Sequence, residues 1–215
     1  MQTISSEDAV SMIPHGASLM IGGFLGVGTP ELLIDGLVRH RKGDLTVIAN
    51  DTAVPGKGIG RLVSAKLVRK VIVSHIGLNP ETQKQMMTGD IEVELVPQGT
   101  LIERIRAKGF GLGGVLTPTG IGTLAEEGKR KVSVEGKDYL LELPLRADFA
   151  LVQAFLSDYY GNLTYALTAR NFNPLIAMAA DKVIVEAEHV VPVGLIPPDH
   201  VVTPAPLVDF MVAHG

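Results

Sequence analysis

The stretch from Gly16 to Pro30 reads GASLMIGGFLGVGTP, and it predicts the first strand–loop–helix unit of an α/β fold. Leu19-Met20-Ile21 is a short apolar run that is typical of a buried strand. The glycine-rich loop Gly22–Gly28 follows, and Thr29-Pro30 is a good N-cap and first-turn pair for a helix. Ligands of open α/β sheets bind beyond the carboxyl ends of strands, and helix starts attract negative charge. The loop is therefore a candidate ligand site, although a tight turn without a ligand fits the same pattern.

The same unit recurs along the chain, which indicates an open, mostly parallel, doubly wound sheet with helices on both faces. After residue 109 the pattern changes to a glycine-rich segment and then to an inserted β-hairpin region. The length of 215 residues suits one domain, residues 1–215. The further strands are expected at 45–49, 71–73, 91–96, 131–134, 137–142, 149–152 and 183–185, and the helices at 5–12, 31–40, 60–67, 80–89, 100–109 and 173–180.

Composition excludes several classes of protein. The net charge is -4, and the longest basic run is the short Lys129-Arg130-Lys131, so no nucleic acid partner is expected. The chain has no cysteine, which removes disulfides, thiolate nucleophiles and cysteine-based metal sites. No apolar stretch approaches 18 residues, and Glu7 and Asp8 precede any apolar run. We therefore expect neither a signal peptide nor a membrane segment, and a cytoplasmic location.

Several catalytic and cofactor motifs fail on context or are missing. Residues 109–114 match the string G-x-G-x-x-G, but a predicted helix precedes them and a loop follows, which is the wrong setting for a dinucleotide. The sequence contains neither a P-loop string nor a G-x-S-x-G elbow. The histidines show no metal-ligand spacing, so no metal is expected. His75 suits either a site or a structural hydrogen bond, and Glu126-Glu127 suits either a solvated turn or a gate.

Two amide side chains lie at predicted strand ends. Asn50 comes just after the second strand, and Gln98 comes just after the fourth, in Pro97-Gln98-Gly99-Thr100. Both positions fall on the edge where such sheets bind ligands, and an amide there can donate a hydrogen bond to a developing oxyanion. Each residue also suits a plain turn or cap. Asn50 and Gln98 are thus candidate catalytic residues.

The segment Gly16–Pro30 resembles the signature of the A subunits of family I CoA-transferases, which is a small-residue turn, an apolar strand, G-G-F, and then G-x-P. His15 departs from that signature, because the family usually has Asp or Asn there. Further blocks resemble the same family in the same order along the chain, and they are closest to those of bacterial acetate/butyrate–acetoacetate CoA-transferases. These blocks are Ile48–Asp51, Ser74–Gly77, Val96–Leu101, Thr117–Gly120 and Ala169–Pro174.

The resemblance implies a ping-pong exchange of coenzyme A between a short-chain acyl-CoA and a carboxylate, with CoA as a substrate and no permanently bound cofactor. The nucleophile in this family is a glutamate of the B subunit, in the context Ser-Glu-Asn-Gly, and no such string occurs here. A partner B subunit, in an α2β2 or larger assembly, is therefore implied, and we expect it to dock around Gly109–Gly122. Gln98 and Asn50 match positions beside the thioester carbonyl. The residues that match the CoA-lining loop are Gly22, Gly23, Phe24, Leu25, Gly26, Val27 and Gly28.

Two other functions fit the predicted fold. The first is a stand-alone α/β enzyme of the sugar-phosphate isomerase kind, which would need a complete set of acid and base groups in this chain. The second is a non-catalytic CoA- or nucleotide-binding module, which would bind its ligand alone and transfer no acyl group with any partner.

Overall fold

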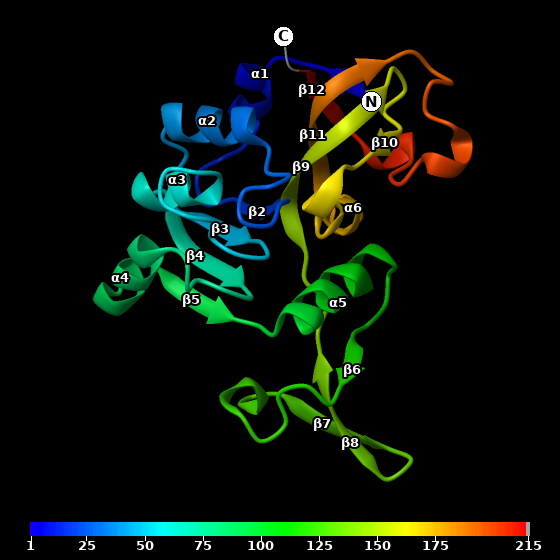
Figure 1. Cartoon of the computed structure of the whole chain (residues 1–215). Coiled ribbons are helices and arrows are strands. Elements are labelled where there is room, and N and C mark those ends of the chain that lie inside the picture. Colours follow the sequence, from blue (N-terminus) through cyan, green and yellow to red (C-terminus); the bar gives the residue numbers. More distant parts are fainter. Residues whose placement is uncertain (214–215) are drawn as a thin grey trace.

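The computed structural model describes residues 1–213, and within them the chain forms one large sheet with helices on both of its faces (Figure 1). Eight strands run parallel, and β10 (Leu163–Thr164) pairs antiparallel with β9. This arrangement confirms the predicted fold class. From one edge to the other, the parallel strands are β1 (Gln2–Thr3), β12 (Phe210–Ala213), β11 (Ala180–Val191), β9 (Ala147–Asp158), β2 (Ser18–Ile21), β3 (Leu45–Ile48), β4 (Val68–Val73) and β5 (Glu92–Leu95).

The two faces of this sheet pack against different helices. Side chains alternate along a strand, so Leu19 and Ile21 of β2 point to one face and Met20 points to the other. The first face packs on α1 (Ser6–Ser11), α2 (Glu31–Arg39) and α3 (Ile59–Ser64), and α4 (Pro80–Thr88) follows at the end of the sheet. The second face packs on α5 (Gln98–Gly109) and α6 (Asn173–Ile176). Burial on both faces explains why the central strands read as continuous apolar runs.

Some boundaries differ from the prediction. The helix α5 begins at Gln98 rather than Thr100, because Pro97 serves as its N-cap. The helix α6 has four residues and ends at Ile176, whereas the sequence predicts a helix to Ala180. Ala180 instead starts β11, which pairs with β9 from its first residue. Both of these strands are 12 residues long, and their buried polar residues conceal this length in the sequence.

A second, smaller sheet lies beyond α5 and away from the large one (Figure 1). It consists of β6 (Val115–Thr117), β7 (Arg130–Val134) and β8 (Lys137–Glu142), all antiparallel. The hairpin of β7 and β8 confirms the predicted inserted region, whereas β6 is not among the predicted strands because it lies within the glycine-rich segment. The guanidinium of Arg104 on α5 donates to the carbonyl of Leu143 at 2.9 Å and so ties this sheet to the main body.

The remaining short helices are 3₁₀ turns in the connections. They are η1 (Leu124–Glu126), η2 (Leu167–Arg170), η3 (Pro198–His200) and η4 (Ala205–Leu207). Among the described residues, no helix has both the length and the apolar character needed to cross a membrane.

Asp158 closes the turn at the carboxyl end of β9. Its Oδ1 accepts hydrogen bonds from the backbone N–H groups of Tyr160, Gly161 and Asn162 at 2.9–3.0 Å, and its Oδ2 accepts one from the Asn162 amide at 2.8 Å. Burial raises the pKa of the Asp158 carboxyl group, but the hydrogen bonds from Asn162 and the other backbone groups outweigh burial. The net pKa therefore lies below its ordinary value.

Replacing Asp158 with asparagine is expected to make folding stability less sensitive to acid. A carboxyl group whose folded pKa is depressed contributes stability above its unfolded pKa of about 3.9, and this contribution disappears as the pH falls through the folded pKa. Urea unfolding at pH 7 and at successive values below 4 measures the effect. Asp158→Asn should be less stable than the wild type at pH 7, and the difference should shrink toward low pH. Asp199→Asn, at an exposed position in η3, is the control, and an unchanged gap at all pH values would contradict the expectation.

Candidate functional site

The loop Gly22–Gly28, between β2 and α2, is a fixed tight turn rather than a flexible connection. Phe24 and Val27 exchange two backbone hydrogen bonds of 2.9 Å across it. The two residues between them, Leu25 and Gly26, have φ angles of 48° and 82°. Positive φ at both central positions is the geometry of a type I′ turn, and glycine adopts it without steric cost whereas leucine does not.

Only some amides of this loop can meet a ligand. The Gly22 N–H donates to the Leu151 carbonyl at 3.1 Å, and the Phe24 and Val27 N–H groups bond each other's carbonyls. The Leu25 N–H donates to the carboxylate of Asp51 at 3.0 Å. The remaining three amides have no acceptor within residues 1–213, and they belong to Gly23, which is buried, and to Gly26 and Gly28, which are partly exposed. The loop thus has two partly exposed backbone donors, Gly26 and Gly28, that are candidates to meet a ligand.

The start of α2 differs from the prediction. Pro30, not Thr29, is the N-cap, and the Thr29 hydroxyl instead donates back to the Gly22 carbonyl at 3.2 Å. The Leu33 N–H, in the first turn of the helix, donates to the Glu186 carboxylate at 3.0 Å, and Glu186 is 1% exposed on β11. The positive end of the helix is therefore matched by a carboxylate of the chain itself. The first turn of α2 is thus already engaged by a side chain of this chain, and the candidate donors for a ligand are those of the loop.

Asn50 lies directly after β3 and is joined to the loop through its neighbour Asp51. The Asn50 side chain is 3% exposed, and its Nδ2 donates to Asp51 Oδ2 at 2.8 Å. The same carboxylate oxygen accepts the Leu25 N–H of the loop. The Ser74 hydroxyl donates to the Asn50 backbone carbonyl at 2.8 Å from the end of β4. Asn50 is thus held in place from two neighbouring strands.

Gln98 is connected to the loop through a different segment, the one that carries Asn171 and Asn173. It is the first residue of α5 and is exposed, and its Nε2 lies 3.5 Å from the Asn171 Oδ1. Two residues on, the buried Asn173 donates to the carbonyls of Gly28 and Ala169 at 2.9 Å each. No hydrogen bond joins Gln98 to Asn50 within the described chain. Each is connected to the loop separately, Asn50 through Asp51 and Gln98 through the segment that carries Asn173.

Sequence reasoning misses two residues that organise this site. In the sequence, Asp51 is only part of a turn, and Asn173 is only the start of a helix. Asn173 accepts the Gln153 N–H of β9 at 2.9 Å while it donates to Gly28, so it links three segments. Both residues lie in blocks that resemble the family, and this could have indicated that they are important. The local sequence pattern, however, does not predict which distant residues a side chain contacts.

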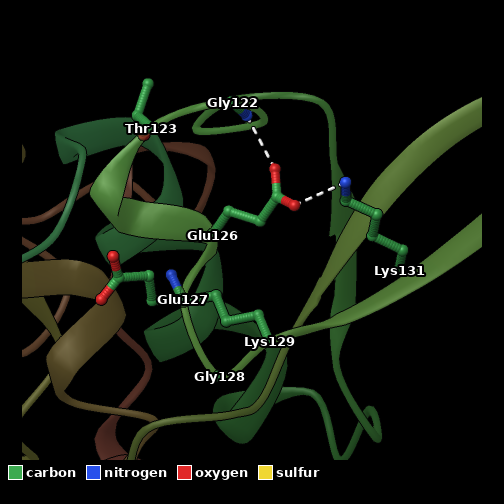
Figure 2. Close-up of a pocket in the computed structure, with 7 residues that line it drawn as sticks. All are labelled: Gly122, Thr123, Glu126, Glu127, Gly128, Lys129 and Lys131. Carbon is green, nitrogen blue, oxygen red and sulfur yellow. Dashed lines mark hydrogen bonds and ion pairs between the residues drawn. The ribbon is translucent and has the colours of Figure 1, made fainter.

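Glu126 lies in a surface pocket of the inserted region (Figure 2). Its carboxylate accepts the Gly122 N–H at 2.7 Å and pairs with the Lys131 ammonium at 2.5 Å. The hydrogen bond from Gly122, followed by that from Lys131, lowers the pKa of the Glu126 carboxyl group. Both carboxylate oxygens are occupied in closing its own loop, which favours the interpretation of a structured turn over that of a gate. The pocket is lined by Gly122, Thr123, Glu126, Glu127, Gly128, Lys129 and Lys131.

His75 follows β4, and its backbone forms an isolated parallel bridge with Asp51. The side chain is exposed and lies over Gly77, where the Cβ of any larger residue would come within 2.6 Å of the His75 Cε1. Within residues 1–213 no group of three or more histidine, aspartate or glutamate side chains is arranged to hold a metal ion.

The chemistry of this edge of the sheet is that of neutral donors. The free amides of Gly26 and Gly28 and the side-chain amides of Asn50 and Gln98 are groups that donate hydrogen bonds to a carbonyl oxygen that gains negative charge, if one lies within reach. The carboxylates of Asp51 and Glu186 each accept backbone N–H groups of this chain, so both are engaged within the protein.

Comparison with known proteins gives a match over nearly the whole chain. Residues 3–214 match the family model described as Coenzyme A transferase. The chain is 54% identical over 206 residues to the acetate CoA-transferase subunit alpha of Escherichia coli K12, which covers 96% of this chain and 94% of that protein. It is 52% identical over 209 residues to the acetoacetyl-CoA:acetate/butyrate CoA transferase alpha subunit of Clostridium acetobutylicum, covering 97% and 96%.

A solved structure shows the same fold at lower identity. The acyl-CoA transferase of Escherichia coli O157:H7, in a thioester complex with CoA, superposes with a TM-score of 0.88 at 24% identity. The match covers 99% of this chain but 47% of the other. This chain therefore spans about half the length of that protein.

Proposed function

This chain belongs to the coenzyme A transferase family, and from that premise we propose that it is the alpha subunit of a two-chain enzyme that moves coenzyme A between a short-chain acyl-CoA and a carboxylate. The acyl groups proposed are acetyl, butyryl and acetoacetyl, as the names of the two relatives suggest. The observation that carries the proposal is identity above 50% to two alpha subunits over nearly the full chain.

The proposed exchange proceeds on a glutamate of the partner chain. Its carboxylate attacks the thioester carbonyl and expels the CoA thiolate, which leaves an acyl–glutamyl anhydride. The thiolate then attacks the glutamyl carbonyl, releases the first carboxylate and forms a glutamyl-CoA thioester. The acceptor carboxylate attacks that thioester and expels the thiolate again, which forms a second acyl–glutamyl anhydride. The thiolate then attacks the acyl carbonyl of this anhydride, forms the new acyl-CoA and releases the glutamate. The glutamate is regenerated, and each step exchanges an anhydride for a thioester or the reverse.

In this scheme the present chain binds coenzyme A and stabilises the negative charge that develops on the carbonyl oxygen. The N–H groups of Gly26 and Gly28 bind coenzyme A, in a loop whose whole length, Gly22–Gly28, lines the site. The amides of Gln98 and Asn50 donate to the carbonyl oxygen as it becomes negatively charged. The fixed type I′ turn supports this role, because donors that are already in position need no reorganisation in the transition state.

We also propose that the beta subunit docks on the inserted region, residues 109–122 and the small sheet. Large apolar side chains are exposed there, with Phe110 at 62% and Leu112 at 54%, which is the kind of surface that a partner covers. The assembly that we propose is α2β2 or larger. We also propose that residues 1–215 form one domain, and the pairing of β1 with β12 in the large sheet supports this. The cytoplasm is the proposed location, and coenzyme A is a substrate rather than a resident cofactor.

The test is reconstitution with a chain of similar size that carries Ser-Glu-Asn-Gly. The pair should transfer CoA from acetyl-, butyryl- or acetoacetyl-CoA to short-chain carboxylates, and neither chain should do so alone. Isomerase activity of this chain without a partner would overturn the proposal in favour of a stand-alone enzyme. Binding of CoA without transfer in any reconstituted pair would instead indicate a binding module.

A further inference from the structure

We infer that Asp51 is a positioning residue that sets the orientation of the Asn50 amide and the position of the loop tip, an inference that rests on the function proposed above. Asp51 lies at the end of β3, and both oxygens of its carboxylate already accept hydrogen bonds from this chain. It acts through the groups that it holds.

The carboxylate of Asp51 accepts three hydrogen bonds and thereby joins two parts of the site. Its Oδ1 accepts the Ala53 N–H at 2.7 Å, which fixes the turn after β3. Its Oδ2 accepts the Asn50 Nδ2 at 2.8 Å and the Leu25 N–H at 3.0 Å. Hydrogen bonds to a charged acceptor are roughly twice as strong as neutral ones. A single oxygen thus connects a candidate catalytic amide to the tip of the proposed CoA-binding loop.

The hydrogen bond to Asp51 determines the direction in which the Asn50 side-chain amide points. An ionised carboxylate can only accept hydrogen bonds, so the NH₂ end of Asn50 must face it, and the Asn50 Oδ1 lies on the side of the Ser74 hydroxyl at 3.5 Å. One N–H of the Asn50 amide bonds Asp51, and the second has no acceptor among the described residues, so it is the N–H that the proposed function assigns to the oxyanion. A neutral partner at position 51 would allow the Asn50 amide to turn over and present its oxygen, which repels negative charge.

The same carboxylate holds a strained part of the loop. Leu25 has a φ of 48°, in the left-handed region, where a side chain comes too close to the following carbonyl oxygen. The hydrogen bond from Leu25 to Asp51 offsets that cost, because its acceptor is charged. Ala53, on the other side of Asp51, also has a positive φ of 53° and also donates to it. Leu25 and Ala53, which both have positive φ angles, thus both donate a backbone hydrogen bond to the Asp51 carboxylate.

The test is a double-mutant cycle in the reconstituted two-chain enzyme. Asp51→Asn keeps the size of the side chain but replaces one acceptor oxygen with a donor. We expect kcat to fall about 10- to 100-fold, part of what the loss of one oxyanion donor costs in Asn50→Ala. The hold of Asp51 on the loop tip should affect the KM for acyl-CoA, whereas its effect on kcat passes through Asn50, so the double variant Asp51→Asn/Asn50→Ala should have the kcat of Asn50→Ala alone. Asp148→Asn is the matched control, since Asp148 accepts two hydrogen bonds from Ser18 between β9 and β2 at their other ends.

The possible outcomes distinguish failure of the proposed function from failure of the positioning role of Asp51. An inactive wild-type pair would reject the proposed function itself. With an active pair, multiplicative losses in the double variant, or a drop in Asp51→Asn while Asn50→Ala retains full activity, would overturn the positioning role. A purely structural role would lower the midpoint of thermal unfolding and the fraction of active enzyme, but it would not make the two substitutions non-additive in kcat.

Discussion

Replacing Gln98 with alanine is expected to lower kcat of the assembled enzyme about 10²–10³-fold, the usual cost of removing one oxyanion donor. Gln98 is exposed in the first turn of α5, and its amide makes one long contact, to the Asn171 Oδ1 at 3.5 Å. A donor with so little engagement inside the protein remains free to bond a substrate oxygen. Its removal should therefore affect the chemical step more than KM, because the interaction forms as negative charge develops.

Steady-state kinetics with a saturating acyl-CoA measure this effect. Gln83→Ala is the matched control, because Gln83 on α4 donates to the carbonyls of Ile76 and Gly77 and lies outside the proposed site. The control should assemble and turn over as the wild type does. A Gln98→Ala enzyme with intact assembly and near-normal turnover would remove Gln98 from the mechanism.

Replacing Gly22 with alanine is expected to destabilise the protein by about 3 kcal/mol, at the upper end for overpacking, and to weaken binding of coenzyme A. Gly22 does not have a positive φ, so the backbone itself accepts alanine. The obstacle is one side chain, because a Cβ at position 22 would lie 1.8 Å from the Asn173 Oδ1. Asn173 is fully buried and held by three hydrogen bonds, so it cannot move away without breaking them. Thermal unfolding should show a loss of about 6–12 °C for a chain of this size.

A second substitution shows whether Asn173 is the cause. In the double variant Gly22→Ala/Asn173→Ala the clash is gone, so its destabilisation should be smaller than the sum of the two single losses by at least about 1 kcal/mol. Gly36→Ala with Asn173→Ala is the matched control pair. A Cβ added at Gly36 would lie 2.6 Å from the Val10 Cγ2 and meets no atom of Asn173, so removal of the Asn173 side chain makes no room there. Strict additivity in the Gly22 pair would contradict the account of this contact.

The local parts of the fold are predictable from the sequence. The apolar run before Gly22 indicates a strand, and Asn79-Pro80 with Gly89 marks the limits of α4, whose N-cap side chain accepts two backbone N–H groups and whose C-cap is left-handed. Ser5 caps α1 in the same way, through its hydroxyl and the Asp8 N–H. Caps and strand ends depend on neighbours within four residues, so their signals are local.

The contacts that give the site its geometry are not predictable in that way. Glu186 meets Leu33 across 153 residues, and Asn173 meets Gly28 across 145. Single-sequence patterns carry no information about such pairs. The same reasoning explains why the sequence indicates an anion site at the start of α2. The helix start does attract negative charge, but the carboxylate of Glu186 that supplies it lies on a distant strand.

We propose that this chain supplies hydrogen-bond donors to an exchange whose nucleophile is on another chain. The most direct test incubates the reconstituted pair with acyl-CoA in the absence of an acceptor carboxylate and measures the mass of each intact chain. Borohydride reduction, which converts a glutamyl thioester to an alcohol, then identifies the modified residue. The account predicts a CoA adduct on a glutamate of the partner and none on this chain, and a CoA adduct on any glutamate of this chain would contradict it.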